Sequence, residues 1–366
     1  MQLSSVTRSL LAVATAILVG ACGGAASNSG TSNATPAADV GSGNLTGAGA
    51  TFPEPFYTKA FYQYNQLHSK VQVNYQAVGS GAGIKQYTTG TVDFGASDVP
   101  MTQGEVTAAG GADSLVEIPT TLGVVAIAYN LPAVGSLQLD GSALSGIFLG
   151  SIKSWDDAAI KALNPGAGLP SKPITVVHRS DGSGTTYAFT DYLGKVSPDW
   201  KSKVGVGKSV SWPVGIGGQG NAGVGQAVKQ TDSSIGYVEL AYVVQTGMQA
   251  ALMKNADGKF VKPSLDGATA AAAGNSGLSP DNFSITNNPG PTTYAIASFS
   301  WVILKKTQAD AAKGRAVVYL FDWLTKDGQT FGKDLQYAPL PKAAQTYADT
   351  QLKSITAGGA PVLKNT

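Results

Sequence analysis

The sequence predicts an α/β protein with largely parallel sheets, divided into two domains. From Leu45 onward, short apolar runs alternate with helical patterns, which is the order of elements in folds of this class. Hydrophobic residues make up 43% of the chain, an ordinary share that supplies a packed core. The chain has 366 residues, more than the about 250–300 residues that one core usually organises, so we expect two domains.

The predicted strands are short runs rich in β-branched residues. Residues 71–75 alternate between apolar and polar side chains, as a half-buried strand does. Four further runs predict strands at residues 91–96, 122–129, 174–177 and 298–304. Helical segments between such runs indicate parallel pairing.

The predicted helices carry apolar residues at helical spacing. They cover residues 52–67, 155–163, 185–193 and 311–324. Residues 261–288 are rich in Ala, Ser, Asn and Gly and weakly patterned, so we expect a loose helix and a loop at the periphery.

The first 21 residues have the features of a signal peptide. Arg8 supplies the positive charge, and residues 10–19 form an apolar run that is too short for a comfortable membrane span. Two small residues follow, and then Cys22, which is the only cysteine in the chain. This order predicts a lipobox, in which Cys22 is acylated and becomes the mature N-terminus. The alternative is an incidental cysteine in the leader.

Residues 22–43 consist mainly of small and polar residues and contain no aromatic residue. Such a segment buries too little apolar surface to fold, so we expect a lipidated, flexible tether. The sequence therefore predicts an exported protein, in the periplasm or at the cell surface, that its N-terminal lipid holds to a membrane. The later sequence contains no run that is long and apolar enough to span one.

The charge of the chain excludes one class of partner. Charged residues make up 13% of the sequence and the net charge is +2, whereas soluble proteins average about 25% charged residues and nucleic-acid binders carry basic stripes. We therefore expect no nucleic-acid partner. Two histidines and one cysteine give no convincing transition-metal cluster, and we expect no cofactor.

Three helix starts, one of them near residue 80, are expected after a glycine-rich segment and a hydroxyl residue. Thr51, Ser80 and Ser183 are the expected N-caps, and Pro53 suits the first turn of the first helix. The simple interpretation of each start is a capped helix. A helix N-terminus also has unpaired N–H groups and a partial positive charge, so three such starts together predict an anion site.

Arg179 lies beside the third helix start and is one of three arginines in the chain. Its guanidinium presents a fork of donors that suits a tetrahedral oxyanion. Asp181, two residues later, is expected to hold the guanidinium in place. A purely structural ion pair between the two residues is the alternative, and it is compatible with an anion site.

Asp98 ends a predicted strand shortly before Pro100, a position that usually indicates a turn. In an anion site its carboxylate repels the ligand unless the ligand donates a proton. Phosphate carries such a proton near neutral pH and sulfate does not, and a buried acceptor left unpaired costs about 1–3 kcal/mol. We therefore expect Asp98 to select against sulfate.

Four separated segments together resemble the phosphate-binding protein of bacterial high-affinity phosphate ABC transporters. In order, they read LTGAGATFP, NYQAVGSGAG, VDFGASDVP and HRSDGSGTT. The likeness extends from about Leu45 to near the C-terminus. It implies a type II periplasmic-binding-protein fold of two lobes, each a mixed, mostly parallel sheet flanked by helices.

The resemblance also implies how the chain divides. Two hinge crossovers would lie near residues 122–128 and 294–298. Lobe I would comprise residues 44–123 and 297–366, and lobe II would comprise residues 124–296.

The resemblance further implies the ligand and its residues. Inorganic phosphate would lie between the lobes and be passed to permease subunits in the membrane, and the receptor would be a monomer and not an enzyme. Asp98 would accept the phosphate proton, and Asp181 would brace Arg179 from behind. The phosphate-binding residues would be Thr51, Phe52, Ser80, Asp98, Arg179, Ser183, Gly184 and Thr185.

Two rival functions stay open at this point. A secreted phosphatase or esterase would use Ser183 or Thr185 as its nucleophile, with His178 as base, and a binding protein for another oxyanion would use the same site. Residues 215–220 match the dinucleotide fingerprint G-x-G-x-x-G. They follow a Trp-Pro pair and not a clear strand, so we expect a structural segment there.

Overall fold

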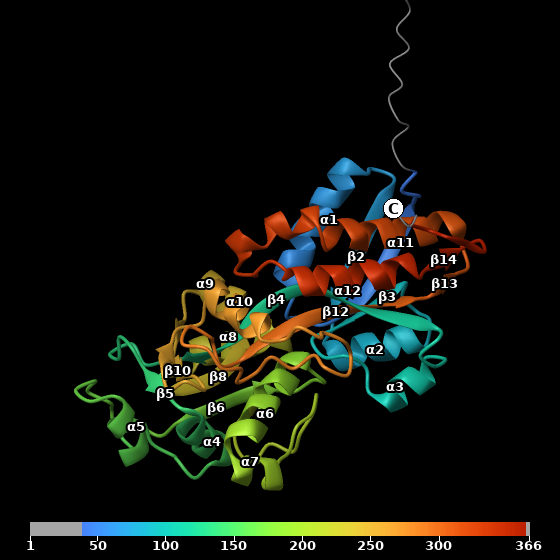
Figure 1. Cartoon of the computed structure of the whole chain (residues 1–366). Coiled ribbons are helices and arrows are strands. Elements are labelled where there is room, and N and C mark those ends of the chain that lie inside the picture. The colour runs from blue at the N-terminus through green and yellow to red at the C-terminus, as the bar shows by residue number, and fades with distance from the viewer. Residues whose placement is uncertain (1–38, 364–366) are drawn as a thin grey trace, which may run out of the picture. The chain divides into compact units, whose positions relative to one another are not determined.

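The computed structural model describes residues 39–363 (Figure 1). The predicted signal peptide, Cys22 and the tether up to residue 38 lie outside the described residues, as do residues 364–366. The last residues of the predicted tether take part in the fold. The Ser42 N–H donates to the Ala312 carbonyl (3.4 Å), and strand β1 (Gly43–Gly49) already begins at Gly43.

A nine-stranded mixed sheet forms the centre of the fold, in the order β2-β1-β3-β12-β4-β8-β6-β7, with β9 paired to β4. Pairing is parallel at both ends, where β1 contacts β2 and β3 and where β6 contacts β7 and β8. It is antiparallel in the middle, around β4 and β12. The remaining strands of this sheet are β2 (Val71–Ala77), β3 (Phe94–Ser97), β4 (Leu115–Tyr129), β6 (Thr175–Arg179), β7 (Ile216–Gly218), β8 (Ser234–Glu239), β9 (Gln249–Ala250) and β12 (Ala297–Lys305).

Two small sheets lie apart from this one. The first joins β5 (Gln138–Leu139), β10 (Leu252–Lys254) and β11 (Phe260–Val261), and the second joins β13 (Thr307–Gln308), β14 (Thr356–Ala357) and β15 (Ala360–Pro361). All five predicted strands are present with altered bounds. β3 is the shortest of them, because residues 91–93 form a bend in which the Asp93 carboxylate accepts hydrogen bonds from the N–H and hydroxyl of Thr46 (2.7 and 3.0 Å).

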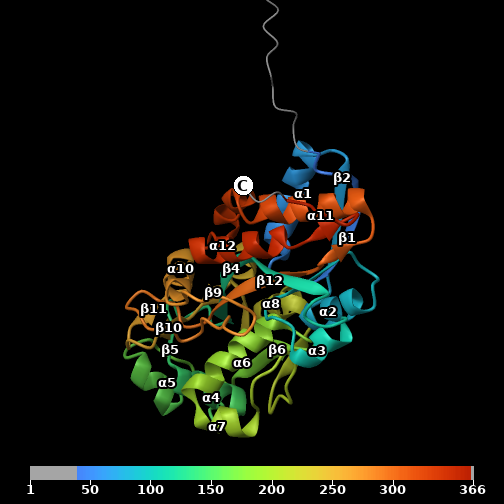
Figure 2. The same cartoon turned by 45° about the vertical axis from the view of Figure 1, so that its right-hand side comes forward.

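Strand β4 connects the two ends of the sheet, and all of its residues are buried. Its residues up to Val124 pair with β12, and its residues from Val125 onward pair with β8. The strand therefore changes partner inside the crossover predicted at residues 122–128. Figures 1 and 2 show β4 and β12 running between the helices α11 and α12 on one side and α4, α5 and α7 on the other. The exact limits of the two lobes stay predictions.

Twelve α-helices accompany the sheets within residues 39–363. The helix predicted at residues 311–324 has these bounds, and its N-cap Asp310 accepts hydrogen bonds from the N–H groups of Ala312 and Lys313. The helices are α1 (Glu54–Leu67), α2 (Ser80–Thr88), α3 (Gln103–Ala108), α4 (Gly141–Leu149), α5 (Ala158–Leu163), α6 (Gly184–Val196), α7 (Pro198–Lys203), α8 (Gly220–Gln230), α9 (Leu240–Thr246), α10 (Leu265–Ala273), α11 (Ala311–Leu324) and α12 (Lys342–Lys353), with 3-10 turns η1 (Asp327–Phe331) and η2 (Lys333–Leu335).

The helix in the segment predicted as a loose peripheral helix and loop packs into the core, whereas the loop that follows it, residues 274–284, is mostly exposed or half-buried. Helix α10 contacts β4 and β12, and Ala268 and Ala271 are fully buried. Gly267 lies so close to Tyr294 that a Cβ there would come within 2.8 Å of it. The small side chains that weakened the apolar pattern are what permit this close packing. Residues 39–363 include no helix with the length and apolar character needed to cross a membrane.

Candidate anion-binding site

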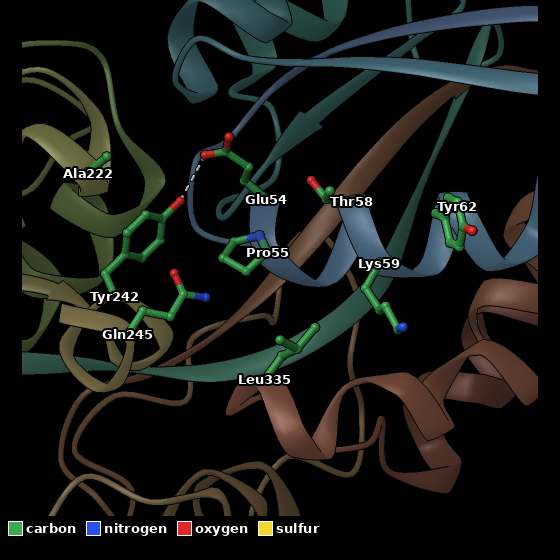
Figure 3. A pocket seen from close by; sticks show the side chains of 9 residues that line it. All are labelled: Glu54, Pro55, Thr58, Lys59, Tyr62, Ala222, Tyr242, Gln245 and Leu335. Carbon is green, nitrogen blue, oxygen red and sulfur yellow. Dashed lines mark hydrogen bonds between the residues drawn. The ribbon is translucent and has the colours of Figure 1, made fainter. Parts of the chain in front are cut away.

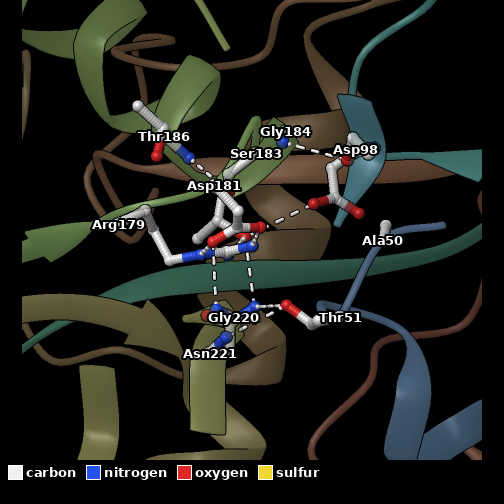
Figure 4. A network of polar contacts seen from close by, with 12 residues as sticks. Ala50, Thr51, Asp98, Arg179, Asp181, Ser183, Gly184, Thr186, Gly220 and Asn221 are labelled. Carbon is white, nitrogen blue, oxygen red and sulfur yellow. Dashed lines mark hydrogen bonds and ion pairs between the residues drawn. The ribbon is translucent and has the colours of Figure 1, made fainter. Parts of the chain in front are cut away.

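The structure gathers the residues predicted for the anion site where strands from both ends of the sheet finish. Thr51 follows β1, Asp98 follows β3, and Arg179 is the last residue of β6, while Ser80 and Gly184 are the first residues of α2 and α6. The carboxyl ends of strands are the usual ligand-binding edge of α/β sheets. Figure 4 shows the segments that carry Thr51, Asp98, Arg179 and Gly184 facing one another.

Arg179 and Asp181 form a buried ion pair. The guanidinium donates from Nε to Asp181 Oδ1 (2.7 Å) and from Nη2 to Oδ2, and the side chains are 1% and 9% exposed. The Gly220 N–H also donates to Asp181 Oδ1 (3.0 Å). Two bonds in parallel fix the plane of the guanidinium, so Asp181 braces Arg179 as predicted and leaves Nη1 directed toward Thr185 (3.4 Å).

Ser183 is the only one of the three predicted N-caps that caps its helix. Its hydroxyl accepts the N–H of Thr186 (3.1 Å) at the start of α6. The prediction for Thr51 was wrong, because α1 starts at Glu54 and its N-cap is Pro53. The prediction for Ser80 was also wrong, because α2 begins at Ser80 itself and its N-cap is Gly79.

Gly79 meets two requirements that a larger residue would violate. Its φ is +94°, and a Cβ there would come within 2.2 Å of Asp181 Oδ2. With the cap position taken by Gly79, the Ser80 hydroxyl is free for a partner outside its own helix. It accepts the N–H of Gly184 (3.0 Å) and that of Asp98 (3.4 Å).

Asp98 is 2% exposed and lies against the start of α6. Its Oδ1 accepts the hydroxyl of Ser300, and its Oδ2 accepts the hydroxyl of Thr185 (3.3 Å). Burial raises the pKa of Asp98 from 3.8 to about 7, although the hydrogen bonds from Ser300 and Thr185 and the charge of Arg179 oppose that shift. The carboxyl group is therefore a stronger proton acceptor than an exposed aspartate.

Phe52 contributes to this site in a different way from the polar residues. Its ring is fully buried and packs edge-on against Tyr337, with ring centroids 6.3 Å apart. The Tyr337 hydroxyl donates to the Phe52 carbonyl (2.6 Å). These contacts fix the backbone between β1 and α1, the segment in which the resemblance expects an amide donor.

Several polar residues of this network were not predicted from the sequence, among them Asn221, Ser300 and Tyr237. Asn221 donates from its backbone N–H and from its side chain to the Thr51 hydroxyl (3.0 and 2.9 Å). The Tyr237 hydroxyl accepts the backbone N–H of Arg179 (3.1 Å). Asn221 follows the G-x-G-x-x-G segment that we expected to be structural. That segment forms the short strand β7 and then starts α8, so a fourth helix start reaches the site.

A separate cavity of about 530 Å³ opens beside the start of α1 (Figure 3). Its lining includes Glu54, Tyr62, Tyr242 and Leu335 but none of the residues predicted for the anion site. The Tyr242 hydroxyl reaches the Thr51 carbonyl (2.6 Å) and the Glu54 carboxylate (2.9 Å). This contact links α9 to the segment that carries Thr51.

The geometry gives the hydrolase alternative little support. The Ser183 hydroxyl is engaged as the cap of α6. The His178 ring stacks on Trp212 with centroids 4.7 Å apart, and its Nδ1 contacts the Arg179 carbonyl (3.0 Å). In residues 39–363, no group of three His, Cys, Asp or Glu side chains is placed to hold a metal ion.

The chain is similar in sequence to known phosphate-binding proteins. Residues 32–321 match the model of the PBP superfamily domain. The chain is 42% identical over 320 residues to the phosphate-binding protein PstS of Xylella fastidiosa, covering 86% of each chain. It is 44% identical over 314 residues to the PstS of Pasteurella multocida, covering 85% of this chain and 90% of that protein.

Solved structures share the fold at lower sequence identity. The phosphate-binding protein from Stenotrophomonas maltophilia superposes with a TM-score of 0.66 at 21% identity, covering 84% of this chain and 94% of that one. A putative phosphate ABC transporter substrate-binding protein from Clostridium perfringens, solved with bound phosphate, gives a TM-score of 0.61 at 18% identity, covering 82% and 100%. The predicted periplasmic-binding-protein fold is thus confirmed.

Proposed function

Because this chain belongs to the PBP superfamily and, within it, to the PstS phosphate-binding proteins, we propose that it is the extracytoplasmic phosphate receptor of an ABC importer. It binds inorganic phosphate and presents it to permease subunits in the membrane. It acts as a binding protein and not as an enzyme. Cys22 carries the lipid that holds it to the membrane, and the receptor works as a monomer.

One observation carries the ligand assignment: a buried carboxyl group faces a buried arginine and several hydroxyl and N–H donors. An anion that brings no proton meets repulsion from Asp98, and a cation meets a site whose free groups are mainly N–H and O–H donors. Phosphate near neutral pH is a tetrahedral anion that both accepts and donates hydrogen bonds. It therefore matches this set of partners better than sulfate does.

In this proposal each site residue has a defined role. Asp98 accepts the phosphate proton, Arg179 donates to the phosphate oxygens, and Asp181 holds the guanidinium in place. The remaining donors are backbone N–H groups and hydroxyls of Thr51, Phe52, Ser80, Ser183, Gly184 and Thr185.

The charges of the site favour binding through hydrogen bonds more than through net attraction. Arg179 is paired with Asp181 in the structure, so the pair has no net charge. The ligand is then held mainly by oriented N–H and O–H dipoles in a region of low dielectric, where such groups act strongly. Closure of lobe I (residues 44–123 and 297–366) on lobe II (residues 124–296) brings these dipoles together, and the closed form docks on the permease.

Calorimetric titration with phosphate, sulfate and arsenate tests this proposal. We expect one phosphate per chain, and sulfate binding that is detected only at far higher concentrations. Asp98→Asn removes the repulsion and offers an amide donor, so sulfate affinity should rise at least about tenfold. The matched control is Asp157→Asn at the N-cap of α5, which should leave both affinities unchanged. Unaltered selectivity in Asp98→Asn would refute the role of Asp98, and absence of phosphate binding would refute the function.

An activity assay on the same protein preparation distinguishes a receptor from a hydrolase. A chromogenic phosphate ester should show no turnover with the phosphate-binding chain. Turnover that disappears in Ser183→Ala would replace the receptor proposal with the esterase alternative.

A further inference from the structure

Asn221 lies in the first turn of α8 and is fully buried. It reaches across the site to Thr51, which is 170 residues earlier in the chain, and to Thr185 at the start of α6. Figure 4 shows Asn221 beside Gly220, facing Thr51. Its side chain therefore joins two hydroxyl residues that come from opposite ends of the sheet.

The orientation of the Asn221 amide follows from its third partner. The Glu239 N–H points at Oδ1 of Asn221 (2.9 Å). Because a backbone N–H only donates, the atom that it faces is the amide oxygen. The amide NH2 group is then directed at the Thr51 hydroxyl (2.9 Å) and at the Thr185 hydroxyl (3.2 Å).

These contacts determine where the proton of the Thr51 hydroxyl points. A hydroxyl has two acceptor lone pairs and one proton to donate. Thr51 Oγ1 accepts two hydrogen bonds, both from Asn221: one from its backbone N–H (3.0 Å) and one from its Nδ2 (2.9 Å). Both lone pairs are used, so the only group that Thr51 has left for a further partner is its proton.

The Thr185 hydroxyl follows the same rule. It accepts from Asn221 Nδ2 (3.2 Å) and from Arg179 Nη1 (3.4 Å). Its proton is directed at Asp98 Oδ2 (3.3 Å). Asn221 thus orients the hydroxyls of both threonines. Through Thr185 it also directs a hydrogen bond to the carboxyl group of Asp98.

We propose that Asn221 is a positioning residue that turns the hydroxyls of Thr51 and Thr185 into donors, and so tunes the site for an anion. This inference deepens the proposed function and rests on it. Asn221 itself does not contact the ligand in this proposal. The part of its contribution that runs through a threonine is lost if that hydroxyl is absent, and that dependence distinguishes it from a residue that only supports the fold.

A double-mutant cycle in phosphate affinity tests the proposal. Asn221→Ala releases one lone pair of the Thr51 hydroxyl, because the backbone N–H of residue 221 still donates to the other. The Thr51 proton is then no longer fixed toward the ligand, and we expect phosphate affinity to fall about tenfold to one hundredfold, the value of a hydrogen bond to a charged group. In the Thr51→Val background the hydroxyl is gone. There the fold-loss of phosphate affinity caused by Asn221→Ala should be at least threefold smaller. Ser80→Ala provides the comparison cycle, because the Ser80 hydroxyl bonds Gly184 and Asp98 and not Asn221. In that cycle the fold-losses of phosphate affinity in the two single variants should multiply to give the loss in the double variant, within about twofold.

One measurement and one control variant distinguish a folding defect from a binding effect. Thermal unfolding without phosphate compares each variant with the parent chain, and Gln226→Ala, an exposed position on α8, serves as the neutral control. If the Asn221 and Thr51 losses simply multiply in chains that bind phosphate, this inference is overturned while the proposed function stands. If the parent chain binds no phosphate, the proposed function falls and this inference falls with it.

Discussion

Replacing Asp98 by Asn should change how the stability of the phosphate-free protein depends on pH. Burial raises the pKa of Asp98 from 3.8 to about 7, so the folded protein disfavours the ionised form. An acid whose pKa is raised by folding binds more protons in the folded state than in the unfolded state between these two values. Stability therefore falls as the pH rises from about 4 to about 7, and the full cost is present above pH 7.

The size of this effect follows from the two pKa values. Each step of one in pKa corresponds to about 1.4 kcal/mol, so the ionised carboxylate costs about 4 kcal/mol at pH 8. At pH 5 most of the folded protein carries the protonated acid, and the cost is about 1.5–2 kcal/mol. Asn does not titrate, and the hydrogen bonds that it keeps or loses with Ser300 and Thr185 count equally at both pH values. The unfolding free energy of Asp98→Asn minus that of the parent chain should therefore be about 2–3 kcal/mol larger at pH 8 than at pH 5.

Urea unfolding followed by tryptophan fluorescence measures this difference. Bound phosphate must first be removed by unfolding the protein, dialysing it and refolding it, because a ligand stabilises the form that it binds. Both chains are then measured at pH 5 and pH 8 in a phosphate-free buffer. A stability difference between variant and parent that is the same at both pH values would show that Asp98 does not titrate in this range, and the reasoning would be wrong.

Two further predictions concern the arrangement around Arg179 and Gly184. Arg179→Lys keeps the charge but cannot form the two parallel bonds to Asp181, so phosphate affinity measured by calorimetry should fall on the order of one hundredfold; an unchanged affinity would show that the charge alone suffices. Gly184→Ala places a Cβ within 2.5–2.7 Å of Asp98 atoms and should hold these segments apart, weakening phosphate binding while the thermal unfolding midpoint changes little. Gly104→Ala is the matched control on helix α3, because a Cβ there meets nothing within 4 Å; equal phosphate affinities for the two alanine variants would contradict this account.

The parts of the site that could be predicted from the sequence depend on neighbours close in the chain. Arg179 and Asp181 are two residues apart, and the geometry of a strand end brings them together whatever the rest of the fold does. Ser183 caps α6 through Thr186, three residues later. Predictions of this kind use local rules of capping and charge pairing, and these rules apply before any tertiary contact is known.

Local rules failed where a partner lies far away in the sequence. The Ser80 hydroxyl bonds Gly184, 104 residues later, and Gly79 takes its place as the cap of α2. Ser300 lies in an apolar run that predicted a strand, and only the fold brings its hydroxyl to Asp98, 202 residues earlier. Asn221 gave no local signal either, since its partner Thr51 is 170 residues away.

In the proposed phosphate site, selectivity would follow from the hydrogen-bond acceptors that the fold has already used. Thr51, Ser80 and Thr185 each accept two hydrogen bonds from protein N–H groups, so each hydroxyl has only its proton left. The oxygens of Asp98 each accept one bond from a hydroxyl, and a carboxylate oxygen can accept a second. The Thr185 proton is already directed at Asp98, so a ligand between these groups meets donors from two hydroxyls, those of Thr51 and Ser80, and an acceptor from the Asp98 carboxyl group. The arrangement favours an anion that still carries a proton. It does so through the direction of its hydrogen bonds, because the charge of Arg179 is already balanced by Asp181.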